Sequence, residues 1–129
     1  MIMSVFCNDD RYGESDGEPS EPGLKIDAMT AFDYVYNSEA LNLDRNRIYL
    51  FGRSLGGAVA IYIAKQHCDK LAGVILENTF TSIGDMIKHV FPILDIGFVK
   101  KYMLRSEWKS IESIADVTCP LLFLSSENV

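Results

Sequence analysis

A serine lies between glycines in segment 52–57, which has the sequence Gly-Arg-Ser-Leu-Gly-Gly. The segment follows the apolar run 48–51 and precedes a helix-forming stretch that begins at Ala58. A G-x-S-x-G sequence between a buried strand and a helix predicts a sharp turn that lifts the serine side chain off the sheet edge. Gly52 and Gly56 carry no Cβ atoms that would collide where the helix crosses back over the strand. The pattern therefore predicts that Ser54 is a nucleophile for acyl transfer.

The elements around this turn follow an α/β pattern. Four apolar runs predict strands, at 1–7, 47–51, 71–76 and 119–125, and helical periodicity predicts helices over 21–37 and 55–67. Runs that are apolar on both faces and alternate with helices indicate a parallel sheet with flanking helices. Residues 79–114 interrupt this alternation with short amphipathic stretches, and we interpret them as a small cap-like helical insertion. Core or cap packing is the favoured interpretation of its apolar side chains, and a membrane-facing or acyl-binding lid is the alternative.

Composition limits the partners that we expect. A length of 129 residues predicts one domain at most, and a net charge of −6 argues against nucleic acid as a partner. The acidic residues in segment 9–18 lack the spacing of a calcium-binding loop, so we expect no metal, and no motif predicts a cofactor. The three cysteines, Cys7, Cys68 and Cys119, match no metal or disulfide spacing. We expect reduced, mostly buried thiols, in a chain that reads as soluble and intracellular.

Four separated blocks, in order along nearly the whole chain, resemble the α/β-hydrolase superfamily. They are 11–17, 48–60, 77–83 and 120–125. The blocks are most similar to the group of α/β-hydrolase domain-containing protein 13 and the bud-emergence homologues. The resemblance implies that Ser54 is the nucleophile and that the Leu55 backbone N–H is an oxyanion donor. It also implies acyl esters or thioesters as substrates, protein-palmitoyl thioesters among them, and a membrane tether N-terminal to this segment in full-length members.

The resemblance further implies that 1–129 is an incomplete α/β-hydrolase domain. The family's second oxyanion donor follows a strand upstream of Met1, and that strand belongs between the strands at 1–7 and 47–51 of this chain. We therefore expect an unfilled slot beside the nucleophile strand. The family's acid and base follow the strand that begins at Pro120, so we expect little turnover from this chain alone. The alternative is a non-catalytic truncated isoform or a binding relic of a hydrolase.

Two residues within the chain could substitute for the acid and base. Glu77 ends the strand after the serine, and His89 follows it, which gives the order serine, acid, histidine found in this fold. Sequence order alone does not place them within hydrogen-bond reach of Ser54. We expect Arg53 to form an ion pair with Glu77, and His67 to lie at the far end of the helix from Ser54.

Overall fold

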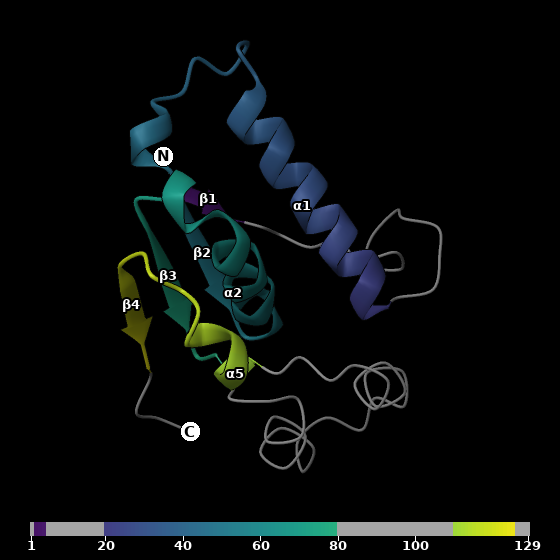
Figure 1. The fold of residues 1–129 in the computed structure, drawn as a ribbon, viewed down its shortest axis with the longest axis vertical. Helices are drawn as coiled ribbons and strands as arrows, with labels where there is room; N and C mark the ends of the chain where they lie inside the picture. Colours follow the sequence, from purple (N-terminus) through teal and green to yellow (C-terminus); the bar gives the residue numbers. More distant parts are fainter. Residues whose placement is uncertain (1, 5–19, 80–109, 126–129) are drawn as a thin grey trace.

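The strands of this protein form a single parallel sheet in a computed structural model that describes residues 2–4, 20–79 and 110–125 (Figure 1). Four strands pair in the order β1-β2-β3-β4. Their bounds are β1 (Ile2–Ser4), β2 (Tyr49–Arg53), β3 (Gly73–Glu77) and β4 (Leu121–Leu124). All three pairings are parallel, so the carboxyl ends of the strands meet at one edge of the sheet. The predicted fold class is thereby confirmed.

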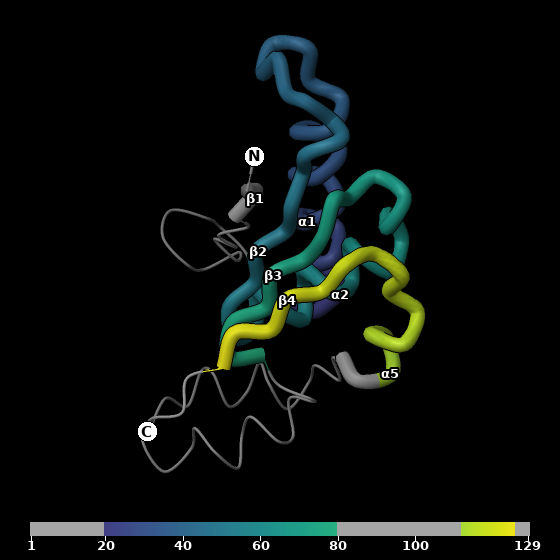
Figure 2. Tube along the Cα trace, turned by 90° about the vertical axis from the view of Figure 1, so that its left-hand side faces the viewer, coloured from purple at the N-terminus to yellow at the C-terminus, as the bar shows by residue number. Residues whose placement is uncertain are grey.

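The described helices lie on one face of this sheet (Figure 2). They are α1 (Glu21–Asn37), α2 (Leu55–His67) and the short α5 (Ser110–Ile114), with single turns η1 (Arg45–Arg47) and η2 (Cys68–Lys70) leading into β2 and β3. Helix α2 contacts β2, β3, α1 and α5, and it is therefore the central packing element of the layer. The two long helices begin and end as the helical periodicity predicts, whereas β2 and β3 each begin two residues later than the apolar runs.

Helix α1 shows how local sequence sets an element. The Ser20 hydroxyl accepts a hydrogen bond from the Gly23 N–H at 3.1 Å, which caps the helix. Its buried stripe, Leu24, Ala28 and Phe32, repeats every four residues and faces α2 and the sheet. The helical periodicity that predicts a helix over 21–37 is thus present as a buried stripe.

The core lies between this helix layer and the two central strands. Leu50 and Val59 are fully buried, and Val74 and Leu76 are 1% exposed. Leu50 and Val74 are register partners in β2 and β3, so both side chains point to the same face, toward α2. This packing holds β2 and α2 in a fixed relation on either side of the turn that joins them.

The expected slot beside β2 is not present. Strand β1 pairs directly with β2, with Ile2 opposite Tyr49 and Ser4 opposite Phe51. The prediction of an unfilled position between these two strands is therefore wrong, because the backbone groups along that edge of β2 find partners in β1. A short strand can occupy this place because parallel pairing needs only backbone complementarity in register.

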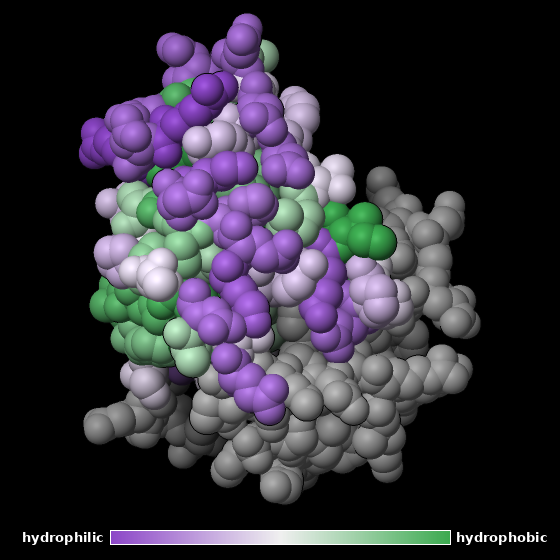
Figure 3. Space-filling view, in the orientation of Figure 1, coloured by the Kyte–Doolittle hydropathy of each residue, from purple (hydrophilic) through white to green (hydrophobic). Residues whose placement is uncertain are grey.

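Apolar side chains are exposed on β4, the outer strand of the described sheet on the side away from β1. Leu122, Phe123 and Leu124 of β4 are 53%, 58% and 44% exposed. Figure 3 shows hydrophobic surface where β4 lies. Among the described strands, β4 pairs only with β3. These three residues therefore have a neighbouring strand on one side only.

Most of the predicted cap-like insertion lies outside the described residues, which include only Thr79 and α5 from the range 79–114. The domain boundaries and the cap therefore stay predictions. In the described part of the chain, no helix combines the length and the apolar character needed to cross a membrane.

Candidate active site

Ser54 occupies a tight turn between the last residue of β2 and the first residue of α2. Its backbone has φ 54° and ψ −121°. The other described non-glycine residues with positive φ are Asn42 and Asn78, a residue type that tolerates this region, whereas serine with this ψ is strained. Two hydrogen bonds of 3.0 Å hold the conformation, from the Gly57 N–H to the Ser54 carbonyl and from the Ser54 N–H to the Glu77 carbonyl. The strand–turn–helix arrangement predicted from the sequence is present.

Close backbone contact explains one of the flanking glycines. A Cβ on Gly52 would lie 2.7 Å from the Gly57 Cα and would also collide with the Gly56 carbonyl group. Gly52 is therefore required because the first turn of α2 crosses directly over β2. The colliding atoms belong to the backbone of Gly56 and Gly57. The sequence also predicted that position 56 must be glycine, and this part stays a prediction.

A second close approach was not predicted from the sequence. A Cβ on Gly57 would lie 2.7 Å from Cγ2 and 3.0 Å from Cβ of Thr79, and it would also meet the Thr79 Oγ1. Thr79 follows β3, and its Oγ1 is buried with no hydrogen-bond partner within the described ranges. Only the tertiary arrangement brings these two residues together, although the doubled glycine at 56–57 is a signal of close packing.

The Ser54 hydroxyl does not cap the helix that follows it. Ser54 is the N-cap residue of α2, yet its side chain makes no capping hydrogen bond, and the residue is only half-buried. The first N–H groups of a helix have no acceptor within the helix, and the helix dipole adds partial positive charge at this end. The Leu55 N–H is the first of these groups, so a developing oxyanion beside Ser54 would face hydrogen-bond donors.

Glu77 lies beside this turn and is paired with Arg53. The two residues are register partners in β2 and β3, and the Arg53 Nε lies 3.9 Å from the Glu77 Oε2. The predicted ion pair is confirmed. Its side chains are 70% and 32% exposed, so the pair adds little to the free energy of folding. Glu77 is thus close to Ser54 through its backbone, while its carboxylate faces a cation.

No histidine among the described residues can reach Ser54. The sequence contains two histidines, and His89 lies outside the described residues. His67 is the last residue of α2, a helix about 20 Å long from its end at Ser54 to this one. Its ring stacks on Phe32 with centroids 4.9 Å apart, and its buried Nε2 has no hydrogen-bond partner in the part of the chain that the structure describes. His67 therefore lies at the far end, as predicted, and the roles of Glu77 and His89 stay predictions.

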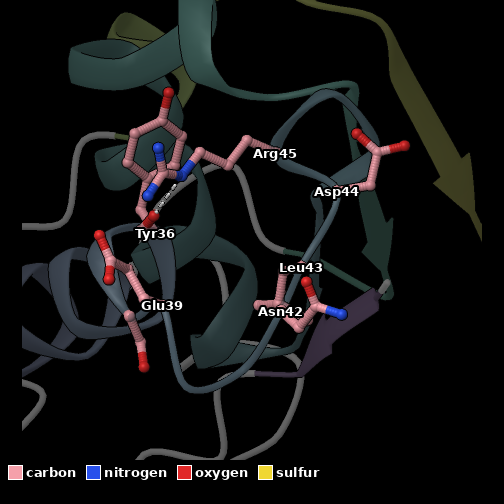
Figure 4. Close-up of a pocket in the computed structure, with 7 residues that line it drawn as sticks. Tyr36, Glu39, Asn42, Leu43, Asp44 and Arg45 are labelled. Carbon is pink, nitrogen blue, oxygen red and sulfur yellow. Dashed lines mark hydrogen bonds between the residues drawn. The ribbon is translucent and has the colours of Figure 1, made fainter.

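A surface pocket of about 410 Å³ lies near the amino end of β2, away from Ser54. It is formed where α1 ends and the chain turns toward η1. Figure 4 shows the Arg45 guanidinium beside the Tyr36 ring, and the Arg45 Nε donates a hydrogen bond of 3.0 Å to the Tyr36 carbonyl. The Lys70 Nζ lies 5.0 Å from the centre of the same ring. The residues that line this pocket lead into the amino end of β2, whereas Ser54 follows its carboxyl end. The pocket is therefore not the site where Ser54 would meet a substrate.

Two of the cysteines lie close together, a contact that the sequence did not predict. Cys68 and Cys119 are half-buried, and their Sγ atoms lie 3.4 Å apart. They are free thiols, as expected, but they are less buried than expected, and parallel β3 and β4 bring together the segments that lead into them. Cys7 lies outside the described residues.

Comparisons with known proteins agree on one kind of relative. The chain is 44% identical over 97% of its length to the α/β-hydrolase domain-containing protein WAV2 of Arabidopsis thaliana, and 42% identical over 99% to protein bem46 of Schizosaccharomyces pombe. It spans 44% and 42% of the lengths of those proteins. It is also 31% identical over 91% of its length to the lysophosphatidylserine lipase ABHD12 of Macaca fascicularis, of which it covers 31%.

A solved structure supports the same relationship. The α/β-hydrolase of Vibrio vulnificus superposes with a TM-score of 0.67 and 28% identity, over 91% of this chain and 44% of that one. No protein-family model matches the chain. In each case the similarity extends across nearly all of the 129 residues and less than half of the relative.

Proposed function

The chain belongs to the α/β-hydrolase superfamily, and on this basis we propose that Ser54 is the nucleophile of an acyl ester or thioester hydrolase. The observation that carries the proposal is the strained backbone of Ser54 at the turn between β2 and α2. Such strain is retained where the surrounding packing enforces it, and it commonly marks a functional position. The turn presents a hydroxyl that makes no capping hydrogen bond, at the carboxyl ends of parallel strands, where α/β folds place their sites.

The reaction follows from groups at the turn. The Ser54 Oγ would attack the acyl carbonyl carbon, and the leaving alcohol or thiol would depart with a proton, leaving an acyl-enzyme that water hydrolyses. The Leu55 N–H, at the N-terminal end of α2, would stabilise the oxyanion of each tetrahedral intermediate. One such donor is typically worth about 10²–10³ in kcat.

The substrate class is the finer part of the proposal. The relative ABHD12 is called a lysophosphatidylserine lipase, and a lipase hydrolyses an acyl ester. We extend this to acyl esters and thioesters, with protein-palmitoyl thioesters as one case. The exposed apolar side chains of β4 do not bear on this choice, because they lie on an outer strand, separated from β2 by β3.

The base is the group on which activity depends. A serine without a base is a weak nucleophile at neutral pH, and the described histidine lies about 20 Å from Ser54. We therefore expect the 129-residue chain to hydrolyse short acyl esters at a rate close to background. A soluble base that reaches the turn should restore acylation if Ser54 is the nucleophile, since the Leu55 N–H lies next to Ser54 at the turn.

The experiment measures covalent labelling of the 129-residue chain by a fluorophosphonate probe, with and without imidazole, by intact mass and peptide mapping. We expect slow labelling that imidazole accelerates and that maps to Ser54. Ser54→Ala should abolish it, and Ser38→Ala, at the end of α1, should leave it unchanged.

Each outcome discriminates between the alternatives. Fast labelling and turnover without imidazole, lost in His89→Ala, would keep Ser54 as nucleophile and identify His89 as its base. Labelling that is scattered over several serines, or that persists in Ser54→Ala, would refute the proposal and favour a non-catalytic relic of a hydrolase.

A further inference from the structure

Two cysteines lie together near the amino ends of β3 and β4, whereas Ser54 lies at the carboxyl end of β2. Cys68 begins η2, the turn that leads into β3, and Cys119 lies two residues before β4. They are 51 residues apart in sequence, yet their Sγ atoms lie 3.4 Å apart. Because β3 and β4 are parallel, the segments that enter them lie side by side, whereas Ser54 follows the carboxyl end of β2. The pair is therefore separate from the proposed hydrolase site.

The environment distinguishes the two sulfur atoms. Burial raises the pKa of Cys68, but hydrogen bonds with the backbone N–H groups and the side chains of Cys119 and Thr118 outweigh burial and lower the pKa below its ordinary value. The two N–H donors lie 3.4 Å and 3.2 Å from the Cys68 Sγ. Burial and the neighbouring Cys68 sulfur raise the pKa of Cys119 to about 11. Cys68 is thus the better attacking thiol, and Cys119 is held as a protonated thiol beside it.

We propose that Cys68 and Cys119 form a thiol–disulfide exchange site that reacts with low-molecular-weight disulfides such as oxidised glutathione. The Cys68 thiolate attacks one sulfur of the disulfide, which forms a mixed disulfide and releases one thiolate. Cys119 then loses its proton to the released thiolate and attacks the Cys68 sulfur, which expels the second thiolate. The protein dithiol is oxidised by two electrons, and the small disulfide is reduced to two thiols.

The geometry suits this exchange. A disulfide has an S–S distance of about 2.05 Å, so the sulfur atoms must approach by about 1.4 Å from their present separation. Neither cysteine lies inside a long helix or a strand: Cys68 is in a single turn, and Cys119 is in the irregular segment before β4. Both residues are half-buried, which leaves access for a small disulfide. The bridge would join the end of α2 to the start of β4.

The test equilibrates the folded 129-residue chain in glutathione buffers of graded reduced-to-oxidised ratio. Free thiols are then blocked with a maleimide, and the products are identified by intact mass and peptide mapping. We expect a single transition in which the protein loses two hydrogen atoms, free thiols fall from three to one, and the linked peptides contain Cys68 and Cys119. Cys7→Ser should leave this transition unchanged.

Two further variants test the separate roles of the sulfur atoms. Cys119→Ser should accumulate a Cys68–glutathione mixed disulfide because the second step cannot occur. Cys68→Ser should leave Cys119 largely unmodified under the same conditions. If either variant fails to fold, the linkage mapped in the unmodified chain still decides the matter.

Several results would overturn the proposal. They are a pair that stays reduced in every buffer, a bridge that uses Cys7, or equal trapping of glutathione in the two variants. Retention of a soft metal ion by the reduced chain, with no bridge in oxidised buffer, would assign the pair to metal binding and refute exchange. None of these measurements depends on hydrolase activity, so failure here is distinct from failure at Ser54.

Discussion

Gly57→Ala tests whether close packing, rather than helix propensity, sets the residue at the start of α2. Gly57 is the third residue of this helix. In a helix interior, alanine is about 1 kcal/mol more favourable than glycine, so propensity alone predicts a more stable protein. The structure predicts the opposite sign, because the added Cβ would lie 2.7 Å from the Thr79 Cγ2 and 3.0 Å from the Thr79 Cβ.

The magnitude depends on which atoms can move. The Thr79 side chain is β-branched and short, and its Cβ is fixed by the backbone, so a rotamer change cannot clear the contact. Overpacking that shifts backbone typically costs about 1–3 kcal/mol. Because three Thr79 atoms are met at once, we use the upper part of this range, about 2–3 kcal/mol. After the gain in propensity of about 1 kcal/mol is subtracted, we expect Gly57→Ala to lower the free energy of unfolding by about 1–2 kcal/mol.

A double-mutant cycle isolates the contact. Thr79→Ala removes Oγ1 and Cγ2 and leaves the Cβ at 3.0 Å from the new methyl group. In that background, Gly57→Ala should be close to neutral, which gives a coupling energy of about 1–2 kcal/mol. Equilibrium urea unfolding of the four proteins, followed by far-UV circular dichroism, measures each term. A stabilising Gly57→Ala in the unmodified chain, or a coupling energy of zero, would refute this reasoning.

Three further predictions concern the core, the turn and the thiols. Leu50→Ala should lower the free energy of unfolding by about 2–5 kcal/mol in urea, because its side chain is 0% exposed, whereas Leu122→Ala, 53% exposed, should cost far less. Ser54→Gly should unfold with about 1 kcal/mol more free energy than Ser54→Ala, because glycine relieves strain at φ 54°; equal stability would contradict the strain. Alkylation by iodoacetamide should begin at lower pH for Cys68, whose pKa is lowered from 9.0, than for Cys119, whose pKa is raised to about 11, since only thiolates react; the reverse order would contradict the assignment.

Local pattern predicts much of the fold. Helix α1 is specified by a capping serine and an apolar stripe at 24, 28 and 32, which act within a few residues of one another. The turn at Ser54 is equally local, since two glycines and a strand–helix boundary lie within six residues. The ion pair between Arg53 and Glu77 was also predictable, because both residues end neighbouring parallel strands.

Pairing across the sheet was beyond local pattern. The unfilled slot expected beside β2 rested on the strand order that the family resemblance implies, and the backbone of β1 occupies that position instead. The acid and base could not be placed either. A hydrogen bond depends on side-chain geometry, and the order of residues along the chain carries none.

By itself, the sequence determined the described helices and strands and the turn at Ser54, because these depend on residues close together in the chain. It indicated the superfamily through four blocks that are each local. Only the tertiary structure decided which distant residues meet. It places Thr79 against Gly57, it pairs β1 with β2, and it brings Cys68 within 3.4 Å of Cys119. These contacts depend on strand order and register, which are set by the packing of the whole sheet against α2 rather than by any single segment.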